Sequence, residues 1–147
     1  MDFLPSFSEF SNKLKKNKNQ IVYTKFSADL DTPVSLMMKL AKEEKNSFLL
    51  ESVTGGEIKG RYSVIGMKPD LIWKCNLEES EINRKVLEKS NNFIKQSNPP
   101  VSELKSLIKE SYLQIPDNLP AMSAGLFGYL SYEMINFVKK FFQRWTK

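Results

Sequence analysis

Three short apolar segments separated by turn signals constrain the fold of this chain more than any other feature. Residues 48–50, 62–66 and 71–75 are rich in the β-branched and aromatic residues typical of strands. Gly55-Gly56 lies between the first two segments and Pro69-Asp70 between the last two. Because such connections are too short for a crossover helix, the spacing predicts an antiparallel meander.

Helical patterns flank these strands. Thr32 can cap a helix and Pro33 suits its first turn, where a missing N–H costs nothing. Apolar side chains then recur at helical spacing until about Asn46. Ser102 is expected to cap a second helix that ends near Tyr112.

The same reasoning predicts the remaining elements. They are a helix over 6–16, a strand over 21–26, a strand or short helix over 78–90, a strand over 121–129 and a helix from Tyr132 onward. The predicted fold class is therefore α+β, with a mostly antiparallel sheet and packed helices.

Composition excludes several classes of protein. The 147 residues suffice for one domain, and the absence of histidine removes every Ser-His or Cys-His dyad. The one cysteine allows neither an internal disulfide nor a cysteine-cluster metal site. The net charge of +5 comes mainly from dispersed lysines, which disfavours nucleic-acid binding. No signal peptide or apolar run long enough to span a membrane is visible, so we expect a cytoplasmic protein.

Two polar groups stand at strand ends. Glu51 and Ser52 could bind an amine there, although a polar strand exit with Ser52 in a turn is the more ordinary interpretation. Arg61 could clamp a carboxylate or phosphate, or form a structural ion pair with Glu51 or Glu57. Since no nucleophile, base and orienting group can be assembled, spacing alone predicts no catalytic site.

Four motifs, read together, resemble anthranilate synthase component I, a chorismate-using family. They are ADLDTPVS at 28–35, SFLLESV at 47–53, GRYSVIG at 60–66 and GLFGYLSYE at 125–133. The resemblance covers roughly residues 20–138. The first motif favours this family over its near relative, aminodeoxychorismate synthase component I.

The resemblance implies a domain organisation. Residues 1–19 are an N-terminal helix with a polar lead-in, and 20–138 are part of the family's N-terminal domain. Residues 139–147 form a divergent basic and aromatic tail. The family's C-terminal chorismate-binding domain is absent from this sequence, so we expect an incomplete part of a larger α/β sandwich that aggregates or stays partly molten by itself.

The resemblance also implies an effector site for L-tryptophan. Its expected residues are Leu50, Glu51, Ser52, Arg61, Tyr62 and Ser63. No catalytic or metal-binding residue is expected in this chain. The Mg²⁺ cofactor and the glutamine amidotransferase component are expected for the parent enzyme.

We expect this chain to be an N-terminal fragment that is inactive by itself. The parent enzyme would convert chorismate and glutamine or ammonia to anthranilate and pyruvate. One alternative is a stand-alone module that binds tryptophan or docks on the amidotransferase. Another is a fragment of aminodeoxychorismate synthase component I. Partners of nucleic-acid or membrane type are not expected.

Overall fold

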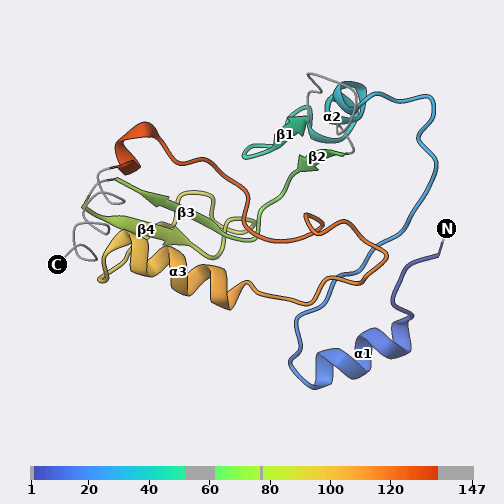
Figure 1. Ribbon diagram of the computed structural model, residues 1–147, viewed down its shortest axis with the longest axis horizontal. Helices are drawn as coiled ribbons and strands as arrows, with labels where there is room; N and C mark the ends of the chain where they lie inside the picture. The colour runs from blue at the N-terminus through green and yellow to red at the C-terminus, as the bar shows by residue number, and fades with distance from the viewer. Residues whose placement is uncertain (1, 52–61, 77, 136–147) are drawn as a thin grey trace. The chain divides into compact units, whose positions relative to one another are not determined.

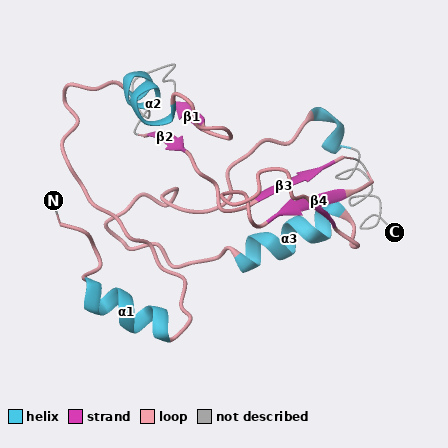
Figure 2. Ribbon diagram, turned by 180° about the vertical axis from the view of Figure 1, so that it is seen from behind, coloured by secondary structure: helices cyan, strands magenta, loops and turns pink. Residues whose placement is uncertain are grey.

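The computed structural model describes residues 2–51, 62–76 and 78–135. Its helices are α1 (Phe7–Lys15), α2 (Pro33–Ala41), α3 (Pro100–Glu110) and the short 3-10 helix η1 (Tyr132–Met134). Its strands are β1 (Phe48–Glu51), β2 (Ser63–Gly66), β3 (Ile72–Cys75), β4 (Ser80–Asn83) and β5 (Ile94–Lys95) (Figures 1 and 2). The α+β class predicted from the sequence is confirmed.

The chain divides into two compact units. One contains Met1–Phe26, Cys75–Ser80 and Gln96–Lys147, and the other contains Ser27–Lys74 and Glu81–Lys95. The strands form two separate sheets, β1-β2 and β3-β4-β5. The predicted meander therefore breaks between β2 and β3, where Lys68 adopts a positive φ of 51° and turns the chain.

The second unit is organised around the β1–β2 hairpin, against which α2 packs (Figure 1). The antiparallel register pairs Phe48 with Gly66 and Glu51 with Ser63. At the first pair, a Cβ placed on Gly66 would overlap three atoms of the Phe48 ring. Gly66 therefore supplies the space into which the aromatic ring packs, and this contact holds one end of the hairpin.

Capping boxes begin the first two helices. Ser6 and Glu9 cap α1 reciprocally, and Thr32 and Ser35 do the same for α2 with Pro33 in the first turn. The predicted start of α2 is thus confirmed. The helix ends at Ala41, before the predicted boundary, because the chain must turn to enter β1, and Asn46 takes a left-handed φ of 61° in that turn.

In the other sheet, a buried amide side chain stabilises the turn that follows β4. Asn83, at the end of β4, has no exposed surface, and its Nδ2 donates to the carbonyls of Lys89 at 2.7 Å and Ser90 at 3.2 Å. Its Oδ1 accepts from the Lys85 N–H at 2.8 Å. The 78–90 segment, which the sequence leaves open, is thus a strand followed by a turn held around one side chain.

Two predicted strands do not form. At 21–26 the structure has a single bridge, between Leu4 and Tyr23, and 121–129 contains turns and irregular chain. A strand needs a neighbour to satisfy its backbone, and no described segment pairs with either stretch beyond that bridge. Side chains hold the first segment instead: Lys25 Nζ donates to the Asn118 carbonyl at 2.8 Å, and Asn118 Nδ2 to the Tyr23 hydroxyl at 2.7 Å.

Two helix boundaries also differ from prediction. α3 begins directly after Pro99, which serves as its N-cap without a side-chain hydrogen bond, so Ser102 lies inside the first turn. Pro100 occupies the first helical position, where its missing N–H is tolerated. The helix predicted from Tyr132 is described only as η1, and its part from 136 onward lies outside the described residues.

The described residues bury few apolar side chains. Those that are buried are Ala41, Ile82, Val86 and Leu107. Large apolar side chains such as Leu30, Tyr129 and Phe7 are 100%, 93% and 84% exposed. Among the described helices, none combines the length and apolarity needed to cross a membrane.

Replacing Gly66 with alanine should destabilise the hairpin. The added Cβ would overlap the Phe48 ring, and such overpacking typically costs about 1–3 kcal/mol. Native-state hydrogen exchange of the hairpin amides measures this loss. Gly128→Ala is the matched control, because nothing lies within 4 Å of a Cβ at that position. Phe48→Leu should partly rescue Gly66→Ala, and equal effects of the two glycine variants would contradict the packing argument.

Candidate functional site

The end of the β1–β2 hairpin at which the chain leaves β1 and enters β2 brings together part of the predicted effector site. Glu51 and Ser63 are register partners, one from each strand, and both are exposed. Directly opposed residues in an antiparallel pair project from the same face of the sheet. A carboxylate and a hydroxyl, which the sequence places twelve positions apart, therefore stand side by side.

Strand alternation separates Leu50 from this pair. Leu50 is paired with Val64, and successive residues of a strand point to opposite faces. The half-exposed Leu50 therefore lies on the other face, while Leu49 and Ile65 share the face of Glu51 and Ser63. These two aliphatic side chains, partly buried, are the apolar neighbours that the sequence alone does not select.

The structure describes one of the three remaining predicted residues. Tyr62 directly precedes β2 and is 51% exposed. Ser52 and Arg61 lie outside the described residues. The structure therefore brings Glu51, Ser63 and Tyr62 to one end of the hairpin and places Leu50 on the reverse face.

This arrangement suits a small amphipathic cation. A carboxylate accepts hydrogen bonds from an ammonium group, and a neighbouring hydroxyl can either accept or donate. Partly buried aliphatic side chains beside them offer a surface for an apolar or aromatic group.

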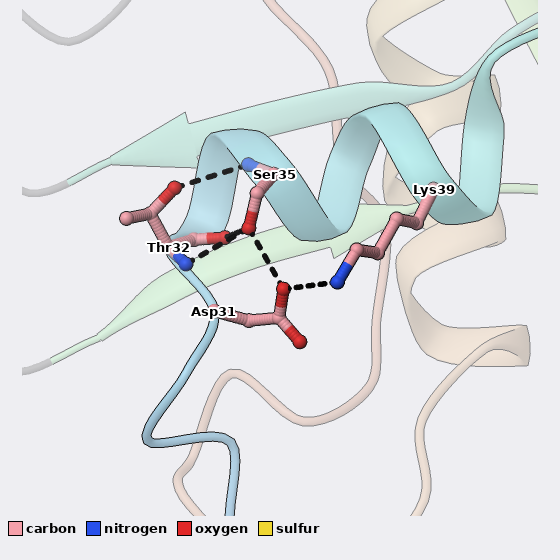
Figure 3. A network of polar contacts seen from close by, with 4 residues as sticks. All are labelled: Asp31, Thr32, Ser35 and Lys39. Atoms are coloured by element: carbon pink, nitrogen blue, oxygen red, sulfur yellow. Dashed lines mark hydrogen bonds and ion pairs between the residues drawn. The ribbon is translucent and has the colours of Figure 1, made fainter.

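A polar network beside the hairpin was not identified as a unit from the sequence. The Asp31 carboxylate accepts from Ser35 Oγ at 3.0 Å and from Lys39 Nζ at 2.5 Å, while Ser35 also completes the α2 capping box with Thr32 (Figure 3). The hydrogen bond from Lys39, followed by that from Ser35, lowers the pKa of Asp31. The four-residue spacing of these three residues is the signal that could have revealed the network.

The described residues do not provide a metal site. In residues 2–51, 62–76 and 78–135, no three carboxylate, cysteine or histidine side chains gather where a metal ion could be held. Burial raises the pKa of the Cys75 thiol, which disfavours its reactive thiolate form. The described residues thus do not fit a Mg²⁺ ion such as the one expected for the parent enzyme.

Comparison with known proteins gives consistent matches. The chain is 52% identical over 136 residues to anthranilate synthase component 1 of Cereibacter sphaeroides, and 36% identical over 138 residues to that of Synechocystis. A probable anthranilate synthase component 1 of Schizosaccharomyces pombe is 34% identical over 134 residues. These matches cover 92%, 92% and 91% of the chain. The chain belongs to the anthranilate synthase component 1 family.

Membership in the family confirms the resemblance inferred from the four motifs. The chain spans 27% of the length of the Cereibacter relative, 26% of the Synechocystis relative and 23% of the Schizosaccharomyces relative. No protein-family model matches the chain. No solved structure matches it significantly.

Replacing Asp31 with asparagine should weaken α2 in a pH-dependent way. Because the pKa of Asp31 is lowered in the folded chain, its stabilising contribution is present above the unfolded pKa of about 3.9 and is lost as the pH falls below it. Thermal unfolding midpoints of wild type and Asp31→Asn should differ at pH 7 and converge near pH 2. The control Asp70→Asn, at an exposed aspartate in a turn, should not reproduce this pattern. A difference that persists at pH 2 would contradict the assigned role.

Proposed function

We propose that this chain is the N-terminal part of an anthranilate synthase component I. In this proposal the complete enzyme converts chorismate and glutamine, or ammonia, to anthranilate and pyruvate in tryptophan biosynthesis, as a lyase. The observation that carries the proposal is the 52% identity over 92% of the chain, combined with a span of 27% of the relative. Glutamine-dependent activity would use a separate amidotransferase component.

The 147 residues alone should be catalytically inactive. The described part of the chain offers no cluster of carboxylate, cysteine or histidine side chains that could hold a metal ion, so we assign the binding of chorismate and Mg²⁺ to the rest of the proposed longer enzyme. Its extensive exposed apolar surface is also what a piece of a larger fold presents. Both observations support a role as one part of a longer enzyme.

Activity should appear when the chain is joined to the rest of a family member. Residues 1–135 would replace the matching segment of the Cereibacter relative, which is 52% identical over 136 residues. We expect the chimera to form anthranilate from chorismate, ammonia and Mg²⁺, measured by anthranilate fluorescence, and the 147-residue chain to form none. A folded but inactive chimera, or an active isolated chain, would overturn this part of the proposal.

The hairpin end would contribute to a tryptophan feedback site. Glu51 would hold the α-ammonium group, Ser63 would stand beside it, and Leu49 and Ile65 would cover part of the indole. Ser52, Arg61 and Tyr62 are proposed as neighbours on sequence grounds, and Leu50 as a residue that supports the hairpin from its other face. In the isolated chain this partial pocket should bind weakly, because the missing walls leave polar groups and the indole exposed.

Glu51→Gln should reduce feedback inhibition in the active chimera. Removing the charge that pairs with the ammonium should raise the tryptophan concentration for half-inhibition by about tenfold or more. Activity without tryptophan should be unchanged. Glu88→Gln, which removes an exposed carboxylate outside the hairpin, is the matched control. If both variants are inhibited like the parent chimera, Glu51 does not bind the effector.

Stand-alone tryptophan binding is the competing function. Isothermal titration of the 147-residue chain with L-tryptophan distinguishes it. Affinity that matches the half-inhibition concentration of the chimera would favour an independent sensor over part of a longer enzyme.

A further inference from the structure

The two ends of the β1–β2 hairpin carry different kinds of contact. Phe48 and Gly66 are partners at one end, where the aromatic ring occupies the space that a Cβ at position 66 would need. Glu51 and Ser63, the polar pair of the candidate site, are partners at the other end. Three residue steps along β1 separate Phe48 from Glu51, a distance of about 10 Å. The ring therefore lies too far from the carboxylate to take part in holding an ammonium group there.

The aliphatic side chains of the hairpin do not select its register. Leu49 and Ile65 lie on one face, and Leu50 and Val64 lie on the other. A shift of one residue between the strands would exchange the faces of one strand relative to the other. Each face would still carry one aliphatic side chain from each strand. Packing against either face therefore distinguishes the two registers only weakly.

An ion pair joins the segments that flank the Phe48 end of the hairpin. Lys68 Nζ, just after β2, lies 3.2 Å from Glu44 Oε1, just before β1. Ion pairs between long, partly exposed side chains contribute little to stability. The flexible lysine stem can also follow a small shift of the strands. The ion pair thus supports this end of the hairpin without specifying the register.

The aromatic ring over a glycine does specify the register. Among the described residues of β1 and β2, Gly66 alone lacks a side chain, and it is the residue that faces Phe48. A shift of one residue in either direction would place Ile65 or Met67 opposite the ring. Aromatic side chains that cover a glycine on the neighbouring strand are a recognised means of fixing strand register.

The same shift would separate the polar pair of the candidate site. Glu51 would then face Tyr62 or Val64 instead of Ser63. The carboxylate would lose its hydroxyl neighbour, and Ser63 would move to the other face of the sheet. The geometry of the site therefore depends on a contact in which none of its own residues takes part.

We infer that Phe48 and Gly66 are positioning residues of the effector site. By fixing the register, they set the affinity of the site for its amino-acid effector and its selectivity for the α-ammonium group. Both act through Glu51 and Ser63, and neither binds the effector. The inference deepens the proposed function and rests on it for the identity of the effector as L-tryptophan.

The test uses the chimera that carries residues 1–135 on the Cereibacter relative, with isothermal titration of L-tryptophan. Gly66→Ala should raise the dissociation constant by about tenfold or more, because Glu51 and Ser63 no longer meet beside the ammonium group. Lys68→Gln is the matched control at the same end of the hairpin. It removes the ion pair, keeps the ring contact and should change the dissociation constant by less than about threefold.

A second substitution should restore binding. Phe48→Leu replaces the ring with a smaller side chain and leaves room for the methyl group of Gly66→Ala. The double variant should therefore bind tryptophan at least about threefold more tightly than Gly66→Ala alone. Titration of the Phe48→Leu single variant completes the double-mutant cycle.

Ligand selectivity separates a positioning role from a general loss of structure. Indole-3-propionate is tryptophan without its α-ammonium group, so the ratio of the two dissociation constants measures what that group contributes. Gly66→Ala should weaken tryptophan binding more than indole-3-propionate binding. Without tryptophan, the kcat of the chimera and its KM for chorismate should be unchanged, whereas a general loss of structure would alter both.

Three results would overturn the inference. They are unchanged tryptophan affinity in Gly66→Ala, equal losses in Gly66→Ala and Lys68→Gln, and equal losses for the two ligands. In an active chimera, any of these would refute the inference alone. An inactive chimera in which Gly66→Ala selectively weakens tryptophan binding would refute the proposed activity alone. A chimera that binds no tryptophan would refute the effector site and the inference together.

Discussion

Cross-strand pairing in the β1–β2 hairpin is the constraint on which the candidate site depends. Side chains alternate between the two faces of a strand, so a shift of one residue in the register would move Glu51 away from Ser63. The Phe48 ring over Gly66 favours one register, because another residue at that position would collide with the ring. A packing contact at one end of the hairpin thus determines which polar groups meet at the other.

The helix beside the hairpin is stabilised by local polar contacts more than by burial. Thr32 and Ser35 satisfy backbone groups at the start of α2, and Asp31 links Ser35 to Lys39 across the next two turns. Only Ala41 of this helix is buried. Contacts between residues three to eight positions apart therefore stabilise α2 with little burial, as expected for a fragment that retains local structure.

Limited burial links the fold to the proposed function. Folding is driven chiefly by removing apolar surface from water, yet side chains such as Leu30 and Tyr129 stay almost wholly exposed. The described residues also leave the β1–β2 pair as a two-stranded sheet, which is marginal by itself. The chain spans about a quarter of the length of its relatives. In the proposed longer enzyme, further residues would cover the exposed side chains and pair with the two-stranded sheet.

The sequence by itself determined the features that depend on neighbouring residues: the Thr32-Pro33 helix start, the strands around Leu49, Val64 and Trp73, and the motifs that identify the family. It also proposed Glu51 and Ser63 as site residues, but not that they face each other. Only the tertiary structure decided that Leu50 points to the other face, that Asn83 closes a turn and that 121–129 is not a strand. Helix capping and strand preference depend on residues close together in the sequence. Strand register and pairing depend on which distant segments come into contact, and the sequence pattern does not specify those contacts.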